Sequence, residues 1–279
     1  ALMDQALAGD DPWVRAAVQL MRGNIAENDG DIDAARRAYA DALARFEDLG
    51  ERWGAGNALD GLARALMVQG DLPAALAALQ RSQQAMEEIG AVDDVAQSQC
   101  WMAQLRLRMG EVEEAELALA DAIERFGRSG SPFAPILTTV VAAEIALSRG
   151  DVAGALRLCG VAAEQAQEAG PAAPPQLRSL ALGMTAALHA LPGGERDLPA
   201  ARREAAEALA LADASRDVPI LAAVAVVVAL LLLAEGDVAA GARVFGAARA
   251  ARGAEDPSNP ICIEVRRQLD GTPRAAAGS

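Results

Sequence analysis

The chain of 279 residues has no lysine, one histidine and few aromatic residues, which make up 3% of it. Its net charge of −14 opposes the counterion release that drives binding to nucleic-acid phosphates, and an anionic membrane would repel it. The longest apolar run, Ile220 to Ala234, has 15 residues, whereas a membrane-spanning helix needs roughly 20. We therefore expect this segment to bind neither nucleic acid nor a membrane directly.

Cysteine is also scarce, which argues against a disulfide framework or a metal centre. Cys100, Cys159 and Cys262 have neither CxxC nor Cys/His spacing, and three is an odd number for disulfide pairing. The chain begins at Ala1 without the charged and then apolar pattern of a signal peptide. We expect an excised piece of a cytoplasmic, reduced protein that carries no cofactor and no metal.

Small aliphatic residues are abundant, and glycine-acid pairs recur among them at a fixed spacing of 40 residues. The pairs are Gly30-Asp31, Gly70-Asp71, Gly110-Glu111 and Gly150-Asp151, and a second series, Gly50, Gly90, Gly130 and Gly170, follows 20 residues behind them. A period of this length indicates stacked repeats, each made of two helices separated by alternating breaks. The predicted fold is all-α, an α-solenoid in one continuous domain.

Small residues also occupy fixed columns within the repeat. Eight residues before the hinge acid stand Gly23, Ala63, Ala103 and Ala143, and the period continues to Gly183 before a short insertion; four after the hinge acid stand Ala35, Ala75, Ala115 and Ala155. We interpret these columns as helix-crossing points, where a larger side chain would hold two helix axes apart. Eight residues after the hinge acid, the larger Tyr39, Leu79, Leu119 and Cys159 fill the remaining space.

The register predicts six helix pairs, with a six-residue insertion that moves the fifth hinge acid from 191 to Asp197. First helices are expected near 13–29, 54–69, 94–109, 134–149, 174–191 and 218–235. The predicted organisation is the end of a truncated upstream helix over 1–9, the solenoid over 10–255, a capping helix within 256–270 and a disordered tail over 271–279. At each hinge, glycine can close one helix in the left-handed conformation while the acid caps the next.

The spacing of Gly23, Ala35, Tyr39 and Ala42 resembles the tetratricopeptide repeat (TPR). The 40-residue period and the segments 49–53, 234–237 and 242–248 are similar to the C-terminal repeats of MalT-like and LuxR-type regulators and of actinobacterial antibiotic-regulatory (SARP-like, BTAD/NB-ARC/TPR) activators. This resemblance implies a sensor or scaffold role for the repeats, with an effector part and a nucleotide-binding switch elsewhere in the polypeptide. An N-terminal effector is the expected arrangement.

The resemblance also implies a concave groove lined by the first helices. From the register, the groove candidates are Asn24, Asn57, Asp60, Arg64, Gln97, Trp101, Gln104, Arg108 and Glu144, with an apolar end around Met184 and Leu230. Asn57, Asp60 and Arg64 share one helix face, because they are three and four residues apart. Trp101 is the sharpest candidate, since an aromatic beside arginine and amides is typical of a recognition surface.

Each candidate also has a structural interpretation. Charged helix faces are usually just solvated, and most tryptophans simply pack. His189 shows no positioned partner in the sequence. The acidic clusters, Asp93-Asp94, Glu113-Glu114-Glu116 and Glu87-Glu88, lie at helix starts or on exposed faces, where solvation and compensation of helix dipoles explain most of them. The carboxylate clamp of chaperone-binding TPR proteins uses lysine. Because this chain has no lysine, a peptide carboxylate bound by such a clamp is disfavoured as the partner.

Three functions stay open. The leading hypothesis is a non-catalytic sensor or protein-interaction domain of a signal-transducing transcriptional regulator, which binds a peptide, a protein partner, a small effector or other domains of the same polypeptide. The alternative is an independent TPR scaffold for complex assembly. An enzyme is disfavoured, because we find no nucleophile-base pair, metal constellation or phosphate-binding loop in the sequence.

Overall fold

The computed structural model describes residues 10–129, 131, 133–170, 174–192, 196–253 and 259–271. Within these residues it holds thirteen α-helices and no strand, so the predicted all-α class is confirmed. The chain divides into two compact units, 1–145 and 146–279. The boundary between the units falls inside the fourth repeat, in helix α8 (Ala134–Ser148). The single continuous solenoid over 10–255 stays a prediction. The expected upstream helix end over 1–9 and the tail beyond Gly271 lie outside the described residues.

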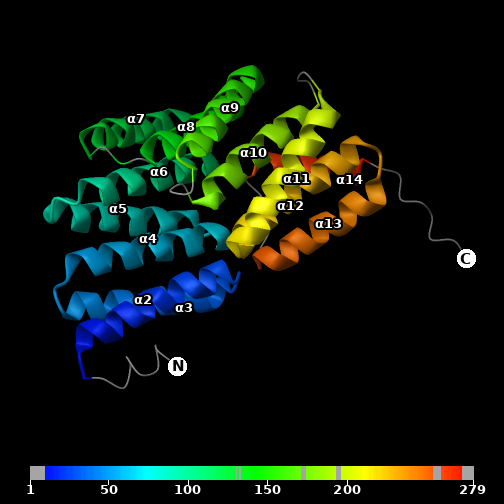
Figure 1. Ribbon diagram of the computed structural model, residues 1–279. Coiled ribbons are helices and arrows are strands. Elements are labelled where there is room, and N and C mark those ends of the chain that lie inside the picture. The colour runs from blue at the N-terminus through cyan, green and yellow to red at the C-terminus, as the bar shows by residue number, and fades with distance from the viewer. Residues whose placement is uncertain are drawn as a thin grey trace, which may run out of the picture. The chain divides into compact units, whose positions relative to one another are not determined.

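Unit 1 is a stack of consecutive helix pairs (Figure 1). Its helices are α2 (Pro12–Asn28), α3 (Ile32–Asp48), α4 (Arg52–Gln69), α5 (Leu72–Glu88), α6 (Val92–Arg108), α7 (Val112–Ser129) and most of α8. The extensive contacts of α2 with α3, α4 with α5 and α6 with α7 form the repeats, and α3 and α5 each pack on the first helix of the following repeat. The first helices begin within two residues of the predicted positions, directly after their capping turns.

Unit 2 also consists of consecutive helices, and the inserted turn lies between its second and third helices. It contains α9 (Val152–Glu168), α10 (Pro175–Ala190), α11 (Leu198–Ser215), α12 (Val218–Ala234), α13 (Val238–Arg252) and α14 (Pro260–Asp270). Helix α14 stands where a last amphipathic helix was expected, and its buried Cys262 and Val265 pack in the same cluster as Leu230 of α12. No helix in the described part of the chain, the very apolar α12 included, is long and apolar enough to cross a membrane.

The hinge turns carry the repeat geometry that the glycine-acid pairs predict. Gly30 and Gly150 both have a φ of 79°, a left-handed conformation that residues with a side chain rarely adopt. The following Asp31 accepts a hydrogen bond from the Ala34 amide at 2.9 Å and so caps α3. At the inserted turn Asp197 performs the same role for α11, through the Ala200 amide at 2.9 Å. The insertion therefore lengthens the loop without changing the way the next helix starts.

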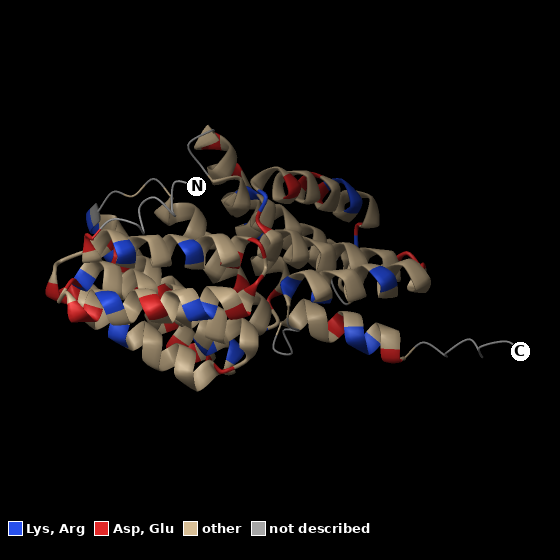
Figure 2. Ribbon diagram, turned by 90° about the horizontal axis from the view of Figure 1, so that it is seen from below, with Lys and Arg blue, Asp and Glu red and all other residues tan. Residues whose placement is uncertain are grey.

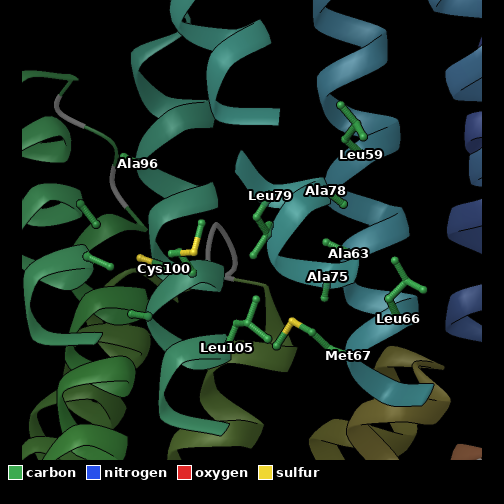
Figure 3. Close-up of a cluster of buried hydrophobic side chains, with 14 of the residues drawn as sticks. Leu59, Ala63, Leu66, Met67, Ala75, Ala78, Leu79, Ala96, Cys100 and Leu105 are labelled. Carbon is green, nitrogen blue, oxygen red and sulfur yellow. The ribbon is translucent and has the colours of Figure 1, made fainter. Parts of the chain in front are cut away.

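The columns of small residues lie at the centre of the packing. Ala63 and Ala103 of unit 1 are fully buried, and Figure 3 shows Ala63 and Ala75 between Leu66, Met67 and Leu79. Around this core, arginines and acidic residues are interspersed along the described helices (Figure 2). The core is thus aliphatic, and its helices approach each other through alanine.

Ala103→Leu is expected to lower the free energy of unfolding by about 1 to 3 kcal/mol, because the added methylenes have no space at a fully buried crossing point. Thermal melts followed by circular dichroism measure the loss. The control is Ala120→Leu on the exposed face of α7, where the melting temperature should barely change. An unchanged or raised melting temperature for Ala103→Leu would show that the crossing point is misplaced.

Candidate partner-binding surface

Four polar residues occupy one column of the repeat, one on each first helix of unit 1. They are Asn24 on α2, Arg64 on α4, Gln104 on α6 and Glu144 on α8, spaced by 40 residues and each one position after the small column. Asn24 is exposed and the other three are half-buried. We call these four residues the polar ladder. A column that repeats from helix to helix forms a continuous row on the first-helix face.

Arg64 is held by a cluster that bridges the first two repeats. Its Nε and one terminal nitrogen both donate to the Glu27 carboxylate at 2.8 Å. The Tyr39 hydroxyl donates to Glu27 Oε2 at 2.5 Å and lies 2.8 Å from Asn24 Oδ1. A two-point arginine-carboxylate pair fixes the planes of both groups, so α2, α3 and α4 share one polar contact.

Charge and burial act in opposite directions on the pKa values of Glu27 and Arg64. Burial alone would raise the pKa of Glu27, but the hydrogen bonds and positive charge of Arg64 lower it below its ordinary value. Burial would lower the pKa of Arg64, and the Glu27 hydrogen bonds and charge raise it. The pKa of Tyr39 is raised, first by burial and then by the Glu27 charge. All three groups therefore keep their usual protonation states at neutral pH.

Trp101 of α6 lies beside the ladder and contacts Arg64. The Arg64 guanidinium carbon lies 5.5 Å from the centre of the Trp101 ring, within the range of a cation-π interaction. Gln104 Nε2 donates to Glu144 Oε2 at 3.0 Å. The structure therefore brings together Asn24, Arg64 and Trp101 on one side and Gln104 and Glu144 on the other.

Asp60 is a buried carboxyl behind the ladder. Its side chain accepts a hydrogen bond from Ser98 Oγ at 3.1 Å, and the residue is 8% exposed. Burial raises its pKa to about 6, although hydrogen bonds from serine and the positive charge of Arg64 oppose the rise. Asp60 thus supports the packing of α4 against α6 and presents little surface to a partner.

Asp60→Asn is expected to stabilise the protein by about 2 kcal/mol at pH 7.5, and the gain should vanish below pH 4. Because the native pKa lies above the ordinary value, the stabilising protonated form is present at low pH and is lost as pH rises through about 6. Urea unfolding of both proteins at pH 4 and pH 7.5 measures the difference. A difference in the free energy of unfolding between the two proteins that does not change with pH would contradict the raised pKa of Asp60.

The remaining candidates are spread more widely. Asn57 donates through its amide to the Trp53 carbonyl of its own helix at 2.9 Å, Gln97 is exposed and Arg108 is half-buried. In unit 2, Met184 is half-buried on α10. Leu230 is fully buried in the α12–α14 cluster, so the prediction that it lines a groove is wrong. The capping helix α14 is part of the core that encloses Leu230.

Sequence reasoning missed two members of the cluster and one pairing. Glu27 was not selected, and Tyr39 was assigned only to fill space. The signal for the special role of Tyr39 was that the only tyrosine of the chain faces two glycines, Gly23 and Gly61. An ideal Cβ on either glycine would lie 2.5 Å or less from the tyrosine ring. His189, for which no partner was apparent, has its Nδ1 2.9 Å from Glu204 Oε2. We found no group of metal-binding residues among the described side chains.

The geometry defines a TPR-like stack of helix pairs with a polar first-helix face. No family model matches the chain, and no curated protein matches it. A Rap protein in complex with Competence and Sporulation Factor is similar in structure, with a TM-score of 0.79 and 13% identity over 96% of this chain and 73% of the Rap chain. The apo form of RapI is similar with a TM-score of 0.65 and 14% identity, over 96% and 89% of the two chains. These likenesses show the fold.

Proposed function

We propose that the chain is a non-catalytic sensor or protein-interaction domain of a multidomain, signal-transducing transcriptional regulator. The observation that carries the proposal is the polar ladder, which repeats along the first helices, with the partly exposed Trp101 beside its Arg64. The charged groups of the ladder are engaged in an ion pair, a cation-π contact and a hydrogen bond. Groups held in this way suit recognition better than proton transfer.

The chemistry of the ladder favours a peptide or an extended protein segment. Asn24 and Gln104 of the ladder, together with Gln97 on the same helix as Gln104, supply side-chain amides, each of which can both donate to and accept from a peptide backbone. Trp101 supplies an aromatic surface of the kind that dominates binding energy at interfaces. The fold likeness adds support, because one of the similar Rap structures is a complex with a second molecule.

The test begins with the identification of a partner. The chain is used as bait, the captured proteins and peptides are identified by mass spectrometry, and the affinity of the purified partner is measured by calorimetry. Trp101→Ala is expected to weaken this affinity at least about tenfold, because central aromatic residues contribute roughly 2 kcal/mol or more. Gln97→Ala, on the exposed part of the same helix, should weaken it less.

The matched control is Glu114→Ala on the exposed face of the second helix α7, which should leave the affinity unchanged. Because Trp101 also packs against the core, Trp101→Leu is measured in parallel to separate loss of the aromatic ring from loss of bulk. Equal affinities for the two Trp101 variants, the control and the unaltered chain would exclude the first-helix face as the binding site.

The alternative is an independent TPR scaffold for complex assembly. In that case the same polar ladder would bind the other members of the complex. The complete reading frame distinguishes the two proposals. A nucleotide-binding segment and a DNA-binding segment in the same polypeptide support the regulator. A frame that encodes only repeats contradicts it and leaves the scaffold.

A further inference from the structure

A pocket of about 190 Å³ opens at the turn between α3 and α4, and none of the groove candidates lines it. It lies between the end of α3, the start of α4 and the last turns of α5. Three residues form an apolar floor: Phe46 is fully buried, Leu59 is 3% exposed and Ala55 is 6% exposed. The pocket therefore reaches the packed core of unit 1 from the edge formed by the inter-repeat turns.

Two ion pairs frame the pocket and connect its walls. Arg81 of α5 pairs with Glu47 of α3 at 2.5 Å, and Arg52 of α4 pairs with Glu88 of α5 at 2.8 Å. All four side chains are between 43% and 56% exposed, so their charged ends remain in contact with solvent. The walls are thus held in place while their charges stay available to a partner.

Two exposed aliphatic residues adjoin lining residues of the pocket in the sequence. Leu49, the C-cap residue of α3, is 40% exposed and directly precedes the lining residue Gly50. Ile89, the C-cap residue of α5, is 46% exposed and directly follows the lining residue Glu88. Exposed aliphatic side chains next to lining residues give a partner apolar surface to cover.

The size and charge of the pocket restrict its occupant. Sites for small molecules usually measure about 300 to 1,000 Å³, so 190 Å³ suits one side chain rather than a metabolite. Three glutamates, at 47, 51 and 88, face two arginines in the lining, and the exposed Asp48 lies next to it in the sequence. The excess of carboxylates complements a cationic partner.

We propose that this pocket is a second docking site, independent of the polar ladder, which anchors one aliphatic side chain of a basic peptide segment. The side chain enters above Phe46 and Leu59, and the flanking cationic residues meet Glu47 and Glu88. Leu49 and Ile89 cover the peptide backbone on either side.

The test uses the full chain and a blocked synthetic peptide with the sequence Arg-Arg-Leu-Arg-Arg. Amide chemical shifts in NMR spectra report where it binds, and their titration gives the affinity. We expect the shifts to centre on Gly50, Glu51 and Ala55. A peptide with alanine in place of leucine should bind at least about tenfold more weakly, because a buried leucine side chain contributes most of the apolar contact. A Glu-Glu-Leu-Glu-Glu peptide should produce no shifts.

Two variants localise the effect. Ala85→Leu fills the pocket from the half-buried face of α5 and should weaken binding at least about fivefold without unfolding the chain. Trp101→Leu, on the ladder, should leave the affinity of this peptide unchanged. The proposal is overturned if the leucine and alanine peptides bind equally, if Ala85→Leu has no effect on a folded protein, or if the shifts centre on α6 instead. None of these results depends on the ladder binding a partner.

Discussion

Arg64→Met is expected to lower the free energy of unfolding by about 3 kcal/mol at pH 7.5, because it leaves a largely buried carboxylate without its cationic partner. The Glu27 side chain is 18% exposed and that of Arg64 is 26% exposed, so water replaces the lost contacts only in part. Urea unfolding followed by circular dichroism measures the loss. At pH 4 the loss should shrink, since the pKa of Glu27, no longer lowered by Arg64, lets the carboxyl take up a proton.

The matched control is Arg45→Met, which removes an ion pair with Asp41 at 3.0 Å whose side chains are 42% and 41% exposed. It should cost no more than about 0.5 kcal/mol, as exposed pairs within one helix usually do. The double variant Glu27→Gln with Arg64→Met should recover at least about 1 kcal/mol of the loss, because no unpaired charge remains. If Arg64→Met and Arg45→Met cost the same, the pair is a solvated surface contact.

Gly61→Ala is expected to destabilise the chain by about 2 to 3 kcal/mol, although alanine favours a helix by about 1 kcal/mol over glycine. An ideal Cβ at position 61 would lie 2.4 Å from Cε1 of the fully buried Tyr39 ring. The ring has little room to move, because it also lies against Gly23, where an ideal Cβ would lie 2.5 Å from it. Thermal and urea unfolding measure the effect.

Gly127→Ala in α7 is the matched control, since nothing lies within 4 Å of a Cβ added there. It should stabilise the chain by up to about 1 kcal/mol through helix propensity alone. Combining Gly61→Ala with Tyr39→Leu should restore part of the loss, as leucine fills the same column in the next two repeats. Changes of the same sign for Gly61→Ala and Gly127→Ala would refute the close packing of Tyr39 between α2 and α4.

Much of the fold follows from the period. Glycine at Gly30, Gly70 and Gly150 and the acid after each determine where one helix ends and the next begins, and these are local effects that a single chain displays. The six-residue insertion was visible for the same reason, because Asp197 caps its helix in the usual way. The division near Ile145 was not visible, since the repeat register runs through it without a break in pattern.

The candidate site was only partly predictable. The column of Asn24, Arg64, Gln104 and Glu144 follows from the period, and so does its place beside the small residues. The pairing of Arg64 with Glu27 depends on side-chain geometry between two helices, 37 residues apart, and Glu27 belongs to a column that holds Met67 and Leu107 in the next repeats. Leu230 could not be assigned to the interior without knowing how α14 packs.

The buried phenol of Tyr39 gives this protein an intrinsic optical reporter. It is the only tyrosine in the chain, and its raised pKa keeps it neutral at alkaline pH values where an ordinary tyrosine, with a pKa near 10, would ionise. At a pH just above the ordinary value of about 10, phenolate absorbance therefore appears only when α2, α3 and α4 separate. The opening of this end of unit 1 can be followed without a label, and separately from the helices of unit 2.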